Sequence, residues 1–82
     1  MKLPRDVGGE ELAALLSRYG YRISRQTGSH LRLSSSAQGG EHHLSIPRHK
    51  PLKVGTLSAV LSDVAGYLER DKQDLVSEIF GR

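Results

Sequence analysis

The sequence predicts an α+β domain, in which a helix, three short strands and a second helix are followed by one more helix at the C-terminal end. Apolar residues recur at helical spacing in residues 9–19, with a period of two in three stretches between residues 21 and 47, and at helical spacing again after residue 53. The chain has 82 residues, which suits one domain over residues 1–82. We therefore expect a three-stranded antiparallel sheet with the helices on its apolar face and the other face open to water.

The first helix is expected over residues 9–19, after a flexible N-terminus at residues 1–7. Glu10 and Glu11 lie in its first turn, where acids interact favourably with the positive end of the helix dipole. Gly20 ends it, because a glycine after the last periodic residue is a common C-terminal cap. The apolar side of this helix comprises Leu12, Ala13, Leu15, Leu16 and Tyr19.

Strands are expected at residues 21–26, 30–33 and 43–47, because apolar and polar residues alternate in each. The inward-facing residues would be Tyr21, Ile23, Leu31, Leu33, Leu44 and Ile46. The same alternation directs His30, Arg32 and His43 to the open face. Residues 34–41 contain three serines and two glycines, which predicts a mobile surface loop.

Two further helices are predicted after the strands. The second has apolar residues at helical spacing, namely Leu57, Val60, Leu61 and Val64. Asp71 with Asp74 three residues later resembles a capping box with a shortened acid, and it begins a C-terminal helix over about residues 71–80. The apolar stripe of that helix is Leu75, Val76, Ile79 and Phe80.

Positive charge is concentrated in the strand region. Between residues 22 and 53 six Lys and Arg residues accompany one acid, Glu41, so this segment carries +5, and the flanks carry −2 to give the net charge of +3. All four histidines lie between residues 30 and 49. A basic, rigid sheet face favours an acidic partner such as a phosphate backbone.

Several classes of site and location are excluded by the composition. The chain has no cysteine, so disulfides, thiolate zinc sites and cysteine nucleophiles are ruled out. No apolar run approaches the roughly 20 residues of a membrane span, and the N-terminus lacks a secretory signal, so we expect a cytoplasmic protein with no membrane partner. The basic segment lacks the carboxylates and convergent ligands of a metal site, so no metal or cofactor is expected.

His30 is the candidate catalytic residue, because it follows a tight turn in the middle of the basic segment. RNA carries its own nucleophile, the 2′-hydroxyl, so a protein that cleaves it needs a proton acceptor, a proton donor and positive charge near the phosphate. An imidazole, with an unperturbed pKa of about 6.5, suits both proton-transfer roles. On the residues alone, the favoured interpretation is an exposed strand residue beside a turn, and the family resemblance described below changes that preference to catalysis. The second proton carrier stays open between His43 and His49.

Residues around His30 are candidates to contact RNA or phosphate. They are Arg25, Ser29, Arg32, Arg48, His49, Lys50 and Lys53. The cations would bind phosphate or stabilise developing charge, and the Ser29 hydroxyl would orient the imidazole or a phosphate oxygen. Gly28 would allow the tight turn before His30. The alternative for residues 48–50 is a solvated loop.

Three segments, in this order and spacing, resemble the HicA (YcfA-like) toxins of bacterial and archaeal HicAB toxin–antitoxin systems. They are Arg25-Gln26-Thr27-Gly28-Ser29-His30, Ile46-Pro47-Arg48-His49 and Lys53-Val54-Gly55-Thr56-Leu57. The resemblance implies a double-stranded-RNA-binding-domain-like fold and a metal-independent endoribonuclease that cuts mRNA, with its catalytic histidine at His30. It also implies a HicB-like antitoxin as the protein partner. The alternative function is a non-catalytic RNA-binding module of the same fold.

Overall fold

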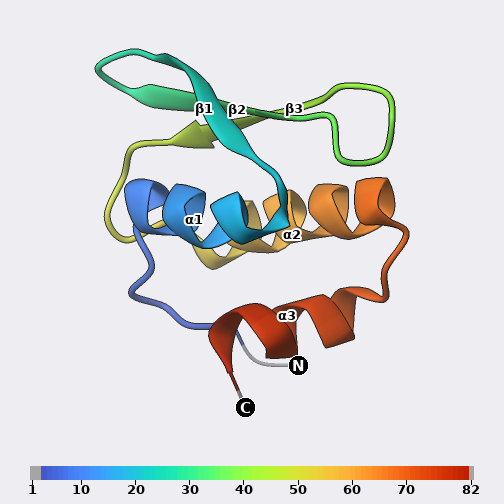
Figure 1. Cartoon of the computed structure of the whole chain (residues 1–82). Coiled ribbons are helices and arrows are strands. Elements are labelled where there is room, and N and C mark those ends of the chain that lie inside the picture. Colours follow the sequence, from blue (N-terminus) through green and yellow to red (C-terminus); the bar gives the residue numbers. More distant parts are fainter. Residues whose placement is uncertain (1–2, 82) are drawn as a thin grey trace.

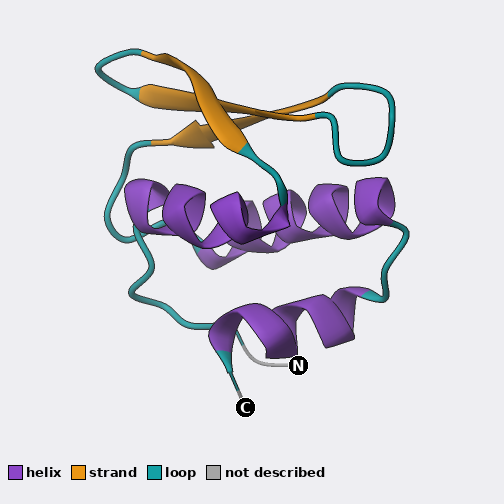
Figure 2. Cartoon of the chain, in the orientation of Figure 1, coloured by secondary structure: helices purple, strands orange, loops and turns teal. Residues whose placement is uncertain are grey.

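The computed structural model describes residues 3–81 and has the expected order of elements (Figures 1 and 2). The elements are α1 (Gly9–Leu16), a 3-10 turn η1 (Ser17–Tyr19), β1 (Arg22–Gln26), β2 (His30–Ser35), β3 (His42–Pro47), α2 (Val54–Leu68) and α3 (Lys72–Phe80). They form three layers, with the sheet on one side of α1 and α2 and α3 on the other. The α+β prediction is confirmed.

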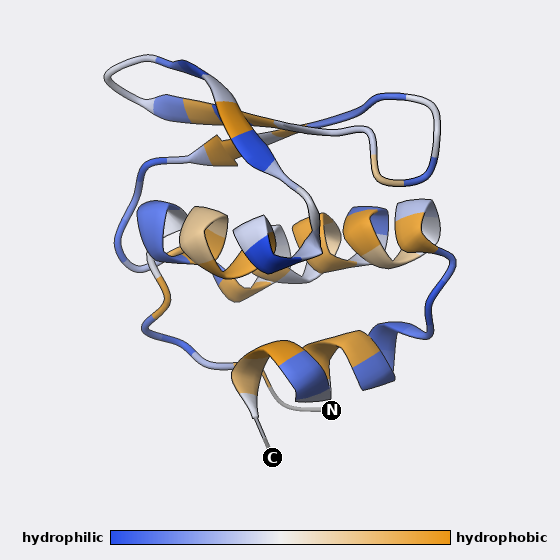
Figure 3. Cartoon of the chain, in the orientation of Figure 1, coloured by the Kyte–Doolittle hydropathy of each residue, from blue (hydrophilic) through white to orange (hydrophobic). Residues whose placement is uncertain are grey.

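The sheet is antiparallel throughout, with the strand order β1-β2-β3. Leu31 pairs with Ile46 and Leu33 with Leu44, and all four side chains are buried, as the alternation predicted. Each helix carries both hydrophobic and hydrophilic residues (Figure 3), and the predicted apolar positions of α2 are buried. One face of the sheet therefore packs on the helices, while the other remains open to solvent.

The alternation fails in β1, where the prediction that Ile23 faces inward is wrong. Ile23 is 49% exposed. The register shifts between Ile23, which pairs with Leu33, and Arg25, which pairs with Arg32, so Ser24 is an extra residue. Such a bulge bends an edge strand and breaks the regular alternation of side chains. It places Arg25 directly across from Arg32.

The predicted loop at residues 34–41 begins later than expected, because β2 continues through Ser35. Ser34 and Ser35 are buried, and β3 begins at His42. The Tyr67 hydroxyl of α2 accepts a hydrogen bond from the Gln38 amide at 3.0 Å and donates one to the Gly40 carbonyl at 2.6 Å. The loop that remains, residues 36–41, is therefore hydrogen-bonded to α2 through Gln38 and Gly40.

The N-terminal segment and α1 pack closely against the end of the sheet. Val7 is buried, and its carbonyl accepts a hydrogen bond from the Leu52 amide at 2.7 Å, although we expected a flexible segment over residues 1–7. Residues 1 and 2 of that segment lie outside the described residues. A Cβ atom on Gly9 would stand 2.0 Å from the Pro47 carbonyl oxygen, so this contact requires glycine. The predicted helix over residues 9–19 ends as a 3-10 turn, with Gly20 at a φ of 90°.

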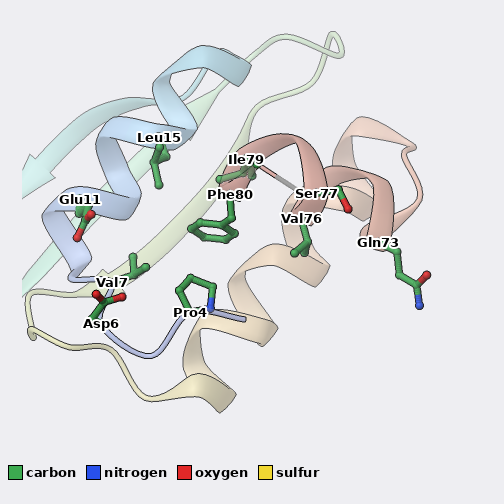
Figure 4. Close-up of a pocket in the computed structure, with 11 residues that line it drawn as sticks. Pro4, Asp6, Val7, Glu11, Leu15, Gln73, Val76, Ser77, Ile79 and Phe80 are labelled. Atoms are coloured by element: carbon green, nitrogen blue, oxygen red, sulfur yellow. The ribbon is translucent and has the colours of Figure 1, made fainter. Parts of the chain in front are cut away.

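The C-terminal helix α3 begins as predicted, because the Asp71 side chain accepts a hydrogen bond from the Asp74 amide at 3.1 Å. Leu75 and Val76 are buried. Beside them, α3, α1 and the N-terminal segment line a groove of about 680 Å³, in which Phe80 lies near Pro4 (Figure 4).

An ion pair and a tyrosine also connect α3 to the preceding elements. Arg70 donates to both carboxylate oxygens of Glu78, at 2.9 and 3.0 Å, and the Tyr19 hydroxyl donates to the same carboxylate. The hydrogen bonds from Arg70, which have the larger effect, and from Tyr19 lower the pKa of Glu78 to about 2. These contacts join the end of η1 to α3.

Candidate active site

A compact turn between β1 and β2 places His30 at the first position of β2. The Thr27 amide donates to the His30 carbonyl at 2.9 Å. The Thr27 hydroxyl oxygen accepts from the amides of Ser29 at 3.3 Å and His30 at 3.0 Å. Gly28 is not in the left-handed region, and a Cβ there would meet no atom within 4 Å, so neither the backbone conformation nor a close contact calls for glycine at this position. The Thr27 side chain holds the turn instead.

The His30 side chain is exposed and has one hydrogen-bonding partner among residues 3–81. Its Nδ1 lies 3.1 Å from the Ser29 hydroxyl, and Nε2 makes no hydrogen bond within the described chain. A contact at Nδ1 restrains the ring and leaves Nε2 available to a ligand. The structure therefore brings Ser29 and His30 together, as the sequence suggested.

His30 borders a hollow of about 400 Å³ on the open sheet face. The hollow is lined by Arg25, Thr27, His30, Arg32, His43, Leu44 and Ser45. An adjacent hollow of about 320 Å³ is lined by Arg22, Ser24, Arg25, Arg32, Ser34, Glu41 and His43. Because Arg25, Arg32 and His43 line both, the two hollows form one groove that crosses the sheet. We call it the sheet groove.

Two arginines, Arg25 and Arg32, line both hollows of the sheet groove. Arg25 and Arg32 are direct cross-strand partners, and neither side chain has a hydrogen bond or ion pair within residues 3–81. Like charges directly opposite one another destabilise a sheet. An anion bound between the two guanidiniums would remove that repulsion and form charge-assisted hydrogen bonds with both.

Of the two candidates for a second proton carrier, the structure brings His43 into the sheet groove and leaves His49 outside it. His43 Nδ1 lies 2.7 Å from the Ser34 hydroxyl, and its Nε2 lies 3.3 Å from a Glu41 carboxylate oxygen. Both ring nitrogens of His43 are therefore engaged. His49 is exposed and lines neither hollow.

The Arg48 guanidinium forms hydrogen bonds with other residues of the chain. Its guanidinium donates to the Glu10 carboxylate, at 3.0 Å from Nε, and to the Thr27 carbonyl, at 2.7 Å. Sequence reasoning missed Glu10 as a residue near the site, because it lies on α1 and no local pattern connects it to the turn. Lys50 and Lys53 are exposed on the connection from β3 to α2 and line neither hollow.

Two features are absent from the described part of the chain. Within residues 3–81 no three His, Asp or Glu side chains are grouped so that they would hold a metal ion. None of the helices in that range combines the length and apolar character needed to cross a membrane.

The fold and the open basic face define a domain of the double-stranded-RNA-binding-domain type, with three antiparallel strands and helices on one side. The family model for the HicA toxin of bacterial toxin–antitoxin systems matches residues 9–65, more than half of the chain. The chain belongs to this family and is thus a toxin of a toxin–antitoxin pair, which implies an antitoxin partner. No curated protein and no solved structure matches it. The matched range ends within α2, so α3 lies outside it.

Proposed function

We propose that this toxin is a metal-independent endoribonuclease of the cytoplasm that cuts mRNA, with His30 as its catalytic residue. The observation that carries the proposal is the position of His30. Its Nε2 is free of partners within residues 3–81, at the edge of a groove lined by the unpaired Arg25 and Arg32. Proton transfer and anion stabilisation are the two functions that RNA cleavage requires of a protein.

In the proposed reaction His30 acts as the general base. It takes the proton of a ribose 2′-hydroxyl, and the 2′ oxygen forms a bond to the adjacent phosphorus. The bond from phosphorus to the 5′ oxygen breaks, which leaves a 2′,3′-cyclic phosphate and a 5′-hydroxyl end. Solvent protonates the leaving 5′ oxygen, because both ring nitrogens of His43 are engaged, and His30 returns its proton to solvent.

The neighbouring residues have separate functions in this proposal. Arg25 and Arg32 bind the scissile phosphate and stabilise the charge that develops on it. Ser29 orients the His30 ring through the 3.1 Å contact at Nδ1. Lys50 and Lys53 attract flanking phosphates as exposed charges. We assign no RNA contact to His49, or to Arg48, whose guanidinium already has two protein partners.

We further propose that a HicB-like antitoxin silences the enzyme by covering the sheet groove with an acidic surface. The groove is basic and open, so an acidic partner would neutralise Arg25 and Arg32 and exclude RNA from His30. An antitoxin that binds only the helical side and leaves cleavage unaffected would contradict this mode of inhibition.

The alternative function, RNA binding without cleavage, is favoured by one observation. Among the described residues the sheet groove contains no second histidine with a free ring nitrogen, while its arginine pair alone would serve to bind a backbone. Such a module would bind RNA in a salt-sensitive manner and leave it intact.

The test is incubation of single-stranded RNA with the purified, antitoxin-free protein in the presence of EDTA. The wild type should cleave, His30→Ala should not, and His49→Ala is the matched control, because it removes an exposed imidazole outside the groove. Intact RNA with the wild type would favour the binding module. Cleavage by a correctly folded His30→Ala variant would refute the assignment of His30.

A further inference from the structure

The Arg48 side chain bridges two segments that are distant in the sequence. On one side it forms an ion pair with Glu10, in the first turn of α1. On the other side it donates to the Thr27 carbonyl at 2.7 Å, and its backbone amide donates to the Ser29 carbonyl at 2.9 Å. The turn that carries His30 is therefore held to β3 and, through Arg48, to α1.

The contacts continue from Arg48 to the catalytic residue. Thr27, whose carbonyl accepts from Arg48, uses its own hydroxyl oxygen to bind the amides of Ser29 and His30. Apart from these contacts the turn is exposed, and a Cβ atom added to Gly28 at its tip would meet no other atom within 4 Å. The orientation of the turn thus depends on a few polar contacts rather than on packing.

We infer that Glu10 and Arg48 form a brace that positions His30, and that Arg48 is a positioning residue rather than a phosphate ligand. The Glu10 carboxylate neutralises the guanidinium, whose side chain is only 26% exposed. Its remaining directed bond goes to the Thr27 carbonyl. Placement of a general base matters to the rate, because a misplacement of about 1 Å costs up to roughly a hundredfold. The inference rests on the proposed function.

Three variants separate positioning from phosphate binding. Glu10→Ala removes the carboxylate partner, and Arg48→Lys keeps the charge but offers one nitrogen in place of a fork that reaches two partners. Glu78→Ala is the matched control, because it removes the ion pair with Arg70 far from the turn. We expect kcat to fall about tenfold in the first two variants and to stay unchanged in the control. RNA affinity and its dependence on salt should stay at the wild-type values in all three.

A second readout needs no RNA. Amide hydrogen exchange at Ser29 and His30 reports how often the turn opens, because both amides are bonded to the Thr27 hydroxyl. We expect exchange there to accelerate several-fold in Glu10→Ala and Arg48→Lys and not in Glu78→Ala. If the wild type does not cleave RNA, the proposed function fails, and the exchange rates still decide whether the brace holds the turn.

Two results would overturn the inference. One is tighter RNA binding by Glu10→Ala with unchanged exchange, since release of a phosphate-binding arginine from its acid would have this effect. The other is a wild-type kcat in Arg48→Lys together with wild-type rates of amide exchange, since any positive charge at this position would then be enough to support cleavage.

Discussion

Replacing Arg25 with glutamine is expected to stabilise the free domain while it weakens the binding of RNA. Arg25 lies directly across from Arg32, and no acid within residues 3–81 pairs with either side chain. The substitution removes a like-charge cross-strand pair, which is worth about 0.2–1 kcal/mol. For a domain of this size that gain corresponds to a rise in Tm of roughly 1–6 °C. Salt should reduce the gain, because both groups are exposed.

The same substitution removes one proposed phosphate contact. For single-stranded RNA each such contact contributes about 0.7 to the slope of log affinity against log salt concentration. Arg25→Gln should therefore lower this slope by about 0.7. The affinities are best measured in a His30→Ala background, so that cleavage does not consume the RNA, and Tm follows from circular dichroism in low and high salt.

Arg18→Gln is the matched control, because Arg18 is an exposed arginine in η1, outside the sheet groove. It should change neither the Tm nor the salt slope appreciably. A lower Tm in Arg25→Gln would refute the reasoning, because it would show that Arg25 has a stabilising partner. A salt slope equal to that of Arg18→Gln would also refute it, because RNA would then not contact Arg25.

Three further substitutions test how the domain is held together. Gly9→Ala should lower the free energy of unfolding by about 3 kcal/mol in urea denaturation, because its Cβ would lie 2.0 Å from the Pro47 oxygen. Gly66→Ala is the control, because Gly66 has open space around it in α2, and this substitution should be neutral or stabilising. Equal effects of the two substitutions on stability would contradict this account. Leu75→Ala should cost roughly 2–5 kcal/mol in one cooperative transition if α3 belongs to the same domain, as we propose, whereas a separate early transition would argue against it. The pKa of Glu78 is depressed to about 2 from 4.5, so the stability that it contributes is present above pH 4.5 and is lost as the pH falls toward 2. The difference in stability between wild type and Glu78→Gln should therefore shrink across that range, and a difference that stays undiminished between pH 4.5 and pH 2 would contradict it.

Much of the architecture follows from local patterns in the sequence. Leu31 and Leu33 alternate with His30 and Arg32, and a regular strand must then bury the first pair and expose the second, as β2 does. The helical spacing in α2 and the Asp71 cap of α3 are equally local, because their partners lie within a few residues. For the same reason, the sequence alone indicated that His30 would be exposed within a basic surface.

The partners of these residues across the fold were decided only by the tertiary structure. Strict alternation would have put Arg25 on the same side as Ile23, and the bulge at Ser24 is what sets Arg25 opposite Arg32. Glu10 reaches Arg48 across 38 residues, so no local pattern predicts that pair. Register, bulges and long-range ion pairs depend on how separate segments come together, whereas alternation and capping depend only on neighbours in the chain. The sequence therefore determined that a histidine would stand on a basic sheet, and the tertiary structure decided which arginines face the groove beside it and which one supports its turn.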